Sequence, residues 1–273
     1  MSATSIPDAD TQTARTTGQA ATKAQLLGPG AMLRLKRWNT PTIYNGWEAC
    51  TKRDRLEGLW NRQETRDFMP SLGTMVGRAV TIRIDPCNPA HPGNKPDAWD
   101  QWFAHVASLP GPKIIVMQDI GKPGAQGSFW GEVSANTHRS LGCVGTIVDG
   151  SIRDLDEMTN AGFKALARRL SVGHLHAWPV DWGGAVEVFG TRIEEGMLVH
   201  ADKHGFIAIP PEDEENLLAA VLALDNAECE TVIPVARFST GLDHDAILER
   251  RRDAAARYGE LASEVRRGAG EWR

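Results

Sequence analysis

Residues 131–154 read GEVSANTHRSLGCVGTIVDGSIRD, and this stretch decides the fold class of the chain. Its first part, residues 132–141, predicts a helix that ends at Gly142, because glycine is the residue that most often terminates helices. The next part, residues 143–148, is almost wholly apolar and predicts a strand that is buried on both faces. A helix followed by a buried strand is typical of sheets that are covered by helices.

The flanking sequence extends this pattern in both directions. Helices and strands alternate in the first half, and hairpins dominate the middle, so the residues predict an α/β or α+β sandwich. The strands are predicted at 76–84, 113–118, 185–189, 197–200 and 206–209, and the helices at 99–109, 212–224 and 243–267. Residues 26–60 are also predicted to be helical, with a break at Thr40-Pro41-Thr42 and a second helix over 45–59. Asp149-Gly150 is predicted to be a turn that ends the strand at 143–148.

The overall composition restricts the partners that the chain is expected to have. Its 273 residues carry a formal net charge of −5, whereas nucleic-acid-binding proteins usually present a basic face. No apolar run reaches the ~20 residues that span a membrane, and the polar N-terminus lacks the apolar segment of a signal peptide. The four cysteines form no C-x-x-C pair, which fits a reducing compartment. We therefore expect a cytoplasmic protein with no nucleic-acid or membrane partner.

The start of the helix at 132–141 offers backbone donors and a carboxylate. Gly131 precedes it, and the N–H groups of Glu132, Val133 and Ser134 are those that a helix leaves without an internal acceptor. Such groups bind carboxylates. A glycine before a helix is also common, and a glutamate in a first turn can simply favour the helix dipole. The motif therefore indicates a substrate-binding site only together with a second one.

The second motif is the pair Arg153-Asp154, which follows the strand at 143–148. The simpler interpretation is that Asp154 caps the next helix together with Glu157, with Arg153 as a surface charge. Against it, ligands collect at the carboxyl ends of strands in α/β sheets, and the glycine-rich turn permits a close approach. Together, the two motifs predict a site that holds a divalent cation and a small dianionic acid.

Other groups do not predict a different chemistry. His174, His176, His200 and His204 do not have the spacing of a zinc site. The chain also lacks the Gly-x-Ser-x-Gly motif of the α/β-hydrolases, which argues against that class.

At this point the sequence resembles the RraA-like family, which includes the class II 4-hydroxy-4-methyl-2-oxoglutarate/4-carboxy-4-hydroxy-2-oxoadipate aldolases. The segments that carry the resemblance are Trp130-Gly131-Glu132, the run GCVGTIVDG at 142–150, Ile152-Arg153-Asp154, the hairpin EGMLVHADKHG at 195–205 and the strand VGRAVT at 76–81. Asn45 departs from the family pattern, because many relatives carry aspartate there. The region beyond Ile209 is also longer than in the smaller aldolases.

The resemblance implies an α-β-β-α sandwich over residues 26–240. We expect a disordered or loosely docked arm at 1–25, and a C-terminal helical extension at 241–273 that lies at a subunit interface. The family assembles as trimers or hexamers with sites between subunits, so a homo-oligomer is expected.

The resemblance also assigns roles to the residues of the two motifs. It implies that Asp154 holds Mg²⁺ or Mn²⁺, with Glu132 acting largely through metal-bound water. It implies that Arg153 contacts the substrate, and that the backbone amides from Gly131 through Val133 to Ser134 hold its carboxylate. Glu132 and Arg153 are the expected catalytic residues.

The implied activity is cleavage of a C–C bond of a small 2-oxo acid through a pyruvate enolate, by aldol cleavage or by oxaloacetate decarboxylation. Two alternatives stay open. Some family members bind and inhibit RNase E without catalysis, and a related lyase or hydratase would act on a larger acid. The Pro-rich segment at 85–97 and the tryptophans near residues 99–102 could shape a pocket for such an acid.

Overall fold

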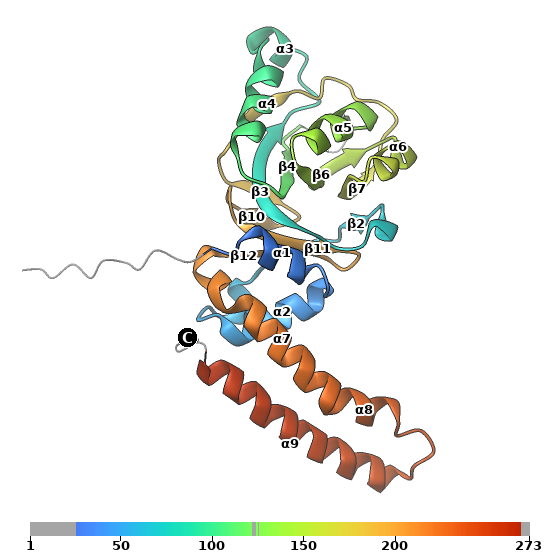
Figure 1. Ribbon diagram of the computed structural model, residues 1–273. Coiled ribbons are helices and arrows are strands. Elements are labelled where there is room, and N and C mark those ends of the chain that lie inside the picture. The colour runs from blue at the N-terminus through green and yellow to red at the C-terminus, as the bar shows by residue number, and fades with distance from the viewer. Residues whose placement is uncertain (1–25, 122–123, 125, 269–273) are drawn as a thin grey trace, which may run out of the picture.

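A large mixed sheet forms the framework of the protein, and β9 and β10 form a separate two-stranded sheet (Figure 1). The computed structural model describes residues 26–121, 124 and 126–268, so the predicted arm at 1–25 lies outside the described residues. The helices are α1 (Pro29–Leu35), α2 (Thr40–Cys50), α3 (His91–Asn94), α4 (Ala98–Ser108), α5 (Glu132–Ser140), α6 (Leu155–Asn160), α7 (Glu214–Glu230), α8 (Val232–Arg237) and α9 (His244–Gly268). The strands are β1 (Leu59–Trp60), β2 (Arg66–Asp67), β3 (Met75–Ile84), β4 (Lys113–Asp119), β5 (Ser128–Trp130), β6 (Cys143–Ile152), β7 (Lys164–Leu170), β8 (Pro179–Trp182), β9 (Val186–Val188), β10 (Thr191–Ile193), β11 (Leu198–Asp202) and β12 (Gly205–Ile209).

The centre of the sheet consists of the parallel strands β3, β4, β6 and β7, in that order. In one row across them, Ile82 pairs with Met117 and Val148 pairs with Ala167. Met117 also pairs with Val148, and all four side chains are buried in one cluster with residues of α4, α5 and α6. These three helices therefore cover one face of the parallel strands, and the carboxyl ends of the strands meet at one edge.

The antiparallel strands β11 and β12 extend the sheet beyond β3 and form a second layer. Their side chains alternate, as expected of strands with two covered faces. Val199 and Ala201 pack against the parallel strands, together with residues of β9 and β10. Leu198 and Ile207 point the other way and pack against α1, α2 and α7. The layers are thus helix, sheet, sheet and helix, which confirms the predicted sandwich.

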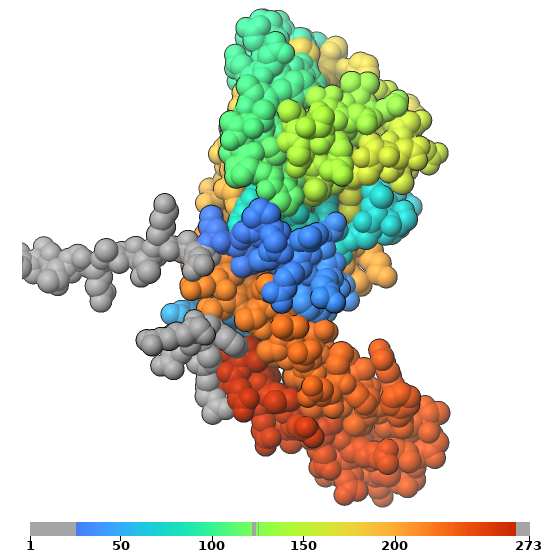
Figure 2. Space-filling view, in the orientation of Figure 1, coloured from blue at the N-terminus to red at the C-terminus, as the bar shows by residue number. Residues whose placement is uncertain are grey.

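A long helical hairpin extends from the second helical layer. In Figures 1 and 2, α7, α8 and α9 project away from the sandwich, and α9 runs back along α7. Its base is an apolar cluster that joins Cys50 of α2, Leu224 of α7 and Val265 of α9. The predicted extension at 241–273 thus contains α9. Over the part of the chain that the structure describes, no helix is both long enough and apolar enough to cross a bilayer.

The predicted break at Thr40-Pro41-Thr42 is wrong, because α2 begins there. The side chain of Asn39 accepts a hydrogen bond from the N–H of Thr42 at 2.9 Å and caps the helix. Pro41 lies in the first turn, where a missing N–H removes no helical hydrogen bond. The helix then ends at Cys50, and the remainder of the predicted second helix forms a short 3₁₀ turn at 55–57 and β1.

The predicted turn at Asp149-Gly150 is also wrong, because β6 continues through both residues to Ile152. The carboxylate of Asp149 accepts hydrogen bonds from Arg168 on the neighbouring strand and from the N–H of Phe189. A Cβ atom at Gly150 would lie 3.2 Å from the Cβ of Asp119. Gly150 therefore permits the close approach of β4 rather than a change in chain direction.

Candidate functional site

The start of α5 and the end of β6 meet at the carboxyl edge of the sheet. Strand β5 lies parallel to the end of β6, with Trp130 paired to Ile152, and this pairing brings the two segments together. The N–H of Glu132 donates a hydrogen bond to Oδ2 of Asp154 at 3.0 Å. The N–H of Arg153 donates to the carbonyl oxygen of Trp130 at 3.2 Å. The two predicted motifs, whose hydrogen-bonded residues are 22 positions apart in sequence, are therefore in direct contact.

At Gly131 there is no room for a side chain while the Asp154 carboxylate keeps its position. A Cβ atom there would lie 2.5 Å from Oδ2 of Asp154 and 3.2 Å from Nε of Arg153. The backbone of Gly131 is extended, with φ −165°, so its conformation does not need glycine. The absence of a side chain is what lets the carboxylate of Asp154 reach the start of α5.

Asp154 has a left-handed backbone, with φ 54° and ψ 52°. This conformation costs a residue other than glycine about 1–2 kcal/mol, and such strain often accompanies functional sites. The side chain of Asp154 makes no capping hydrogen bond to α6, although it directly precedes that helix. The structure thus contradicts the simpler interpretation of Asp154 as a helix cap.

A cavity of about 590 Å³ opens beside the pair, between the β6–α6 junction and the end of β7. Arg153 and Asp154 line it from one side, and Arg169 and Ser171 from the other. Nε of Arg153 lies 3.8 Å from Oδ2 of Asp154, and the two side chains are 39% and 33% exposed. Both charged groups therefore remain accessible to a ligand.

The predicted amide donors are only partly available. The N–H of Glu132 is already bonded to Asp154. The first hydrogen bond within α5 runs from the N–H of Ala135 to the carbonyl oxygen of Gly131 at 2.9 Å. The N–H groups of Val133 and Ser134 precede it and have no acceptor within the helix. The residues from Glu132 to Ser134 are not part of the cavity lining, and the Glu132–Asp154 hydrogen bond connects them to it.

Arg169 and Ser171 were not predicted as site residues. They lie at and just beyond the end of β7, a strand that the sequence pattern did not reveal. The only available signal was Arg168-Arg169 itself, at the end of the apolar run Ala165–Ala167. The hydroxyl of Ser171 donates to the carbonyl oxygen of Gln126 at 2.6 Å, so this side chain helps to fix the wall of the cavity.

The donor set fits a hard divalent cation that keeps most of its water. Among the described residues, no group of three or more histidine, cysteine or acidic side chains is arranged to hold a metal ion. The protein ligands here would be Asp154 and Glu132, both of which supply carboxylate oxygens. Mg²⁺ typically binds through one or two carboxylates and retains several waters. The two residues therefore suit Mg²⁺ or Mn²⁺ better than zinc, which prefers nitrogen and sulfur ligands.

Comparison with known sequences gives one family match and several distant relatives. The model of the RraA-like family, described as Aldolase/RraA, matches residues 40–208. A protein of Halalkalibacterium halodurans, provisionally named 4-hydroxy-4-methyl-2-oxoglutarate aldolase, is 25% identical over 173 residues, which are 60% of this chain and 73% of that protein. Protein DlpA of Legionella pneumophila is 20% identical over 181 residues, or 66% of this chain. The chain spans only 27% of the length of DlpA.

Solved structures share the fold at low sequence identity. An uncharacterized protein from Pseudomonas syringae pv. tomato superposes with a TM-score of 0.64 at 16% identity, over 86% of this chain and 99% of that one. RraAS2 of Streptomyces coelicolor, described as an unusual member of the RNase ES inhibitor RraA protein family, gives a TM-score of 0.58 at 18% identity, over 78% and 98% of the two chains. At such identities the likeness establishes the architecture alone. With the family match over residues 40–208, it leads to one conclusion: this chain belongs to the RraA-like family.

Proposed function

We propose that this protein is a lyase that depends on a divalent metal ion and cleaves a C–C bond of a 2-oxo acid to release pyruvate. The observation that carries the proposal is the contact between the start of α5 and the end of β6. It places the Asp154 carboxylate and the Arg153 guanidinium beside one open cavity, next to the backbone amides of α5. Such a site would serve both aldol cleavage of a 4-hydroxy-2-oxo acid and decarboxylation of oxaloacetate, because both leave a pyruvate enolate.

Arg153 is the group that would stabilise the developing enolate. Its guanidinium is always charged and presents planar donors to oxygen. A preorganised donor of this kind is worth about 3 kcal/mol when it is directed at the atom where negative charge develops. The free N–H groups of Val133 and Ser134 would orient the carboxylate of the substrate.

Asp154 and Glu132 would hold the cation. When bound, Mg²⁺ or Mn²⁺ supplies Lewis-acid stabilisation of the oxygen that becomes negative. Asp154 is fixed for this role by the N–H of Glu132, which leaves its second carboxylate oxygen for the cation. Glu132 is exposed at the first position of α5, and its carboxylate would act on the cation through a water molecule rather than directly.

The direct test is a screen of 2-oxo acids with Mg²⁺ or EDTA, in which pyruvate release is followed by a coupled assay. We expect turnover that EDTA abolishes and that falls at least about a hundredfold in Arg153→Lys, since lysine cannot reproduce the planar fork. Arg192→Lys is the matched control, because the side chain of Arg192 is 70% exposed in a surface pair with Glu194. Wild-type rates in Arg153→Lys would remove Arg153 from the mechanism.

The family description also covers RraA, and this supports the alternative of a regulator of RNase E. Such a regulator would bind its partner with no need of a metal ion. If the screen finds no turnover of any 2-oxo acid, and the protein captures purified RNase E with EDTA present, the alternative becomes the better description.

The proposed assembly is a homo-oligomer, a trimer or a hexamer, whose subunits meet beside the cavity. Large apolar side chains of its lining are exposed there: Leu170 is 46% exposed and Val172 97%. Exposed apolar groups grouped around a pocket often mark an interaction surface. A neighbouring copy on this surface would close the cavity and exclude water from it.

A further inference from the structure

A second cavity lies on the far side of the sandwich from the parallel strands. It has a volume of about 390 Å³ and is formed by the first half of α2, β1 and the β11–β12 hairpin. Its apolar walls come from Tyr44, Trp60 and Ile207, and a half-exposed His204 lies among its lining residues. None of its lining residues belongs to the Arg153 cavity. Pockets for small molecules have this character, with apolar walls and a few fixed polar groups.

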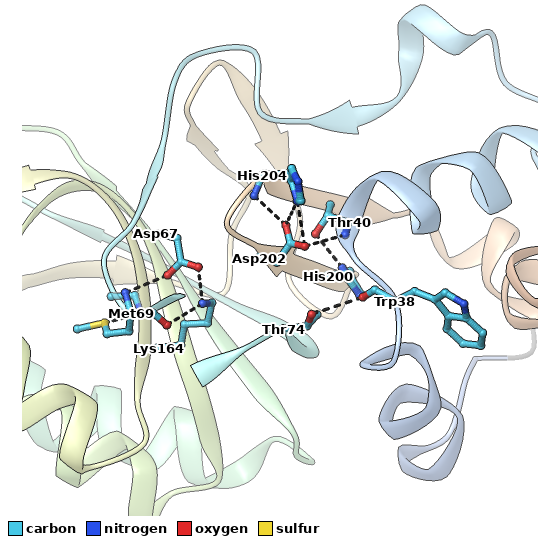
Figure 3. Close-up of polar contacts among 10 residues, drawn as sticks. Trp38, Thr40, Asp67, Met69, Thr74, Lys164, His200, Asp202 and His204 are labelled. Carbon is cyan, nitrogen blue, oxygen red and sulfur yellow. Dashed lines mark hydrogen bonds and ion pairs between the residues drawn. The ribbon is translucent and has the colours of Figure 1, made fainter. Parts of the chain in front are cut away.

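His204 is held in place by a buried carboxylate. Its Nδ1 lies 3.1 Å from Oδ1 of Asp202 (Figure 3). Asp202 is only 6% exposed and also accepts hydrogen bonds from the backbone N–H groups of Thr40 at 3.0 Å and His204 at 2.9 Å. Burial by itself would raise the pKa of Asp202, but these hydrogen bonds outweigh it and the pKa lies below its usual value. Asp202 is therefore ionised at neutral pH.

When the His204 ring carries one proton, the ionised Asp202 determines which nitrogen holds it. The carboxylate can only accept, so Nδ1 is the donor and Nε2 presents a lone pair. In the part of the chain that the structure describes, no protein group bonds to Nε2 of His204. This nitrogen is an oriented acceptor at an apolar cavity.

The neighbouring polar groups are already committed to other partners. Nε2 of the buried His200 lies 3.3 Å from the carbonyl oxygen of Leu35 and donates to it. Nδ1 of His200 must then accept from the hydroxyl of Thr40, 3.0 Å away. The proton of the Thr40 hydroxyl therefore points away from the cavity. His204 is the acceptor with a fixed orientation among the polar groups of the cavity, which also include the amides of Asn45 and Asn61.

We infer that this cavity binds a small phenol. Its aromatic ring would pack against Tyr44 and Trp60, and its hydroxyl would donate a hydrogen bond to Nε2 of His204. A volume of about 390 Å³ accommodates one aromatic ring with a short substituent. This inference is independent of the proposed lyase activity, because it uses a different cavity and different residues.

The test compares two probes of the same shape, 4-fluorophenol and 4-fluorotoluene, by ¹⁹F NMR titration of the full chain. We expect the phenol to bind roughly threefold to tenfold more tightly, which is the range that one net hydrogen bond gives. In His204→Phe the two probes should bind equally. His244→Phe should keep the preference, because His244 is exposed on α9.

Several results would overturn the inference. Equal binding of both probes to the wild type would show an apolar crevice without hydroxyl recognition. Binding of neither probe would show that the cavity is not a ligand site. This holds whether sedimentation shows a monomer or an oligomer in which a second copy covers this face. An unchanged preference in His204→Phe, verified as folded by circular dichroism, would remove His204 from the site. The comparison of the two probes on the wild type remains informative even if that variant does not fold.

Discussion

Gly131 makes the candidate active site sensitive to a single methyl group. We expect Gly131→Ala to fold normally, because its extended backbone suits any residue. Its Cβ would be 2.5 Å from the carboxylate of Asp154 and must displace it. Displacements of about 1 Å in a site reduce turnover roughly a hundredfold, so kcat for the 2-oxo acid found in the screen should fall by that order.

The matched control for this prediction is Gly184→Ala, where a Cβ would meet nothing within 4 Å. Thermal unfolding of the two variants should be similar, whereas their turnover should differ. Full activity in Gly131→Ala would show that the position of the Asp154 carboxylate does not matter for the reaction.

At the scale of residues, the sequence predicted the groups that meet but only part of their surroundings. Glu132, Arg153 and Asp154 were predictable because a helix start and a strand end each expose a defined set of atoms. The left-handed backbone of Asp154 had no signal, since it arises from how β6 turns into α6. Arg169 was missed because its strand contains several charged residues, and a charged segment is usually expected to be an exposed loop.

At the scale of elements, strand β7 is joined to β2 by a buried ion pair. Nζ of Lys164 lies 2.5 Å from Oδ2 of Asp67 (Figure 3), and the two side chains are 2% and 3% exposed. We expect Lys164→Met to lower the free energy of unfolding by about 3–5 kcal/mol, because it leaves Asp67 buried without its partner. Urea denaturation would measure this loss.

Two comparisons make the result specific to the buried pair. Replacing both residues with apolar ones of similar volume should restore much of the stability, because no unpaired charge then remains. Arg192→Met, in an exposed pair with Glu194, should cost less than about 1 kcal/mol. Equal losses in Lys164→Met and Arg192→Met would contradict the assigned role of the buried pair.

Helix α5 is anchored by a histidine that must remain neutral. Nε2 of His138 accepts a hydrogen bond from Trp102 of α4 at 2.8 Å, and its Nδ1 donates to the carbonyl oxygen of Ser134 at 2.7 Å. Burial lowers the pKa of His138 from 6.5 to about 4, and likewise that of His200. Protonation of Nε2 would direct a second donor at the N–H of Trp102.

These lowered values predict that the fold loses stability in mild acid. The unfolded chain takes up the protons near pH 6.5, whereas the native state does not until about pH 4. The contribution of the two neutral histidines to stability is therefore complete above pH 6.5 and decreases as the pH falls from 6.5 to 4. Between pH 7 and pH 5 each histidine should remove about 2 kcal/mol from the free energy of unfolding. Between these two pH values, urea denaturation should show a smaller loss of unfolding free energy in His138→Gln than in the wild type. An identical loss in the two proteins would contradict the prediction.

The elements that the sequence predicted well are those whose own residues decide their structure. Strands β3, β4 and β6 contain long apolar runs, and α4 and α5 have clear terminators. Strands β5 and β8 were missed because they are short and rich in tryptophan or charge. Their structure depends on pairing with β6 and β3, which sequence periodicity does not reveal.

At the scale of the whole molecule, the exposed apolar groups beside the cavity predict assembly. We expect the wild type to sediment as a trimer or a hexamer and Val172→Asp to sediment as smaller species with reduced activity, because Val172 is 97% exposed there. Leu56→Asp is the control, since Leu56 is 82% exposed at a different place in the chain. A monomeric wild type in sedimentation velocity would contradict the proposed assembly.

The packing of α1 and α2 against late parts of the chain has a consequence for synthesis. The indole of Trp38 donates to Asp225, 187 positions later, and the N–H of Thr40 donates to Asp202, 162 positions later. At ~5–20 residues per second, a ribosome needs roughly ten to forty seconds to make that intervening chain. Helices α1 and α2 are thus translated before the segments against which they pack, and they are among the last elements able to dock. Throughout that interval, their apolar faces are open to chaperones and to other nascent chains.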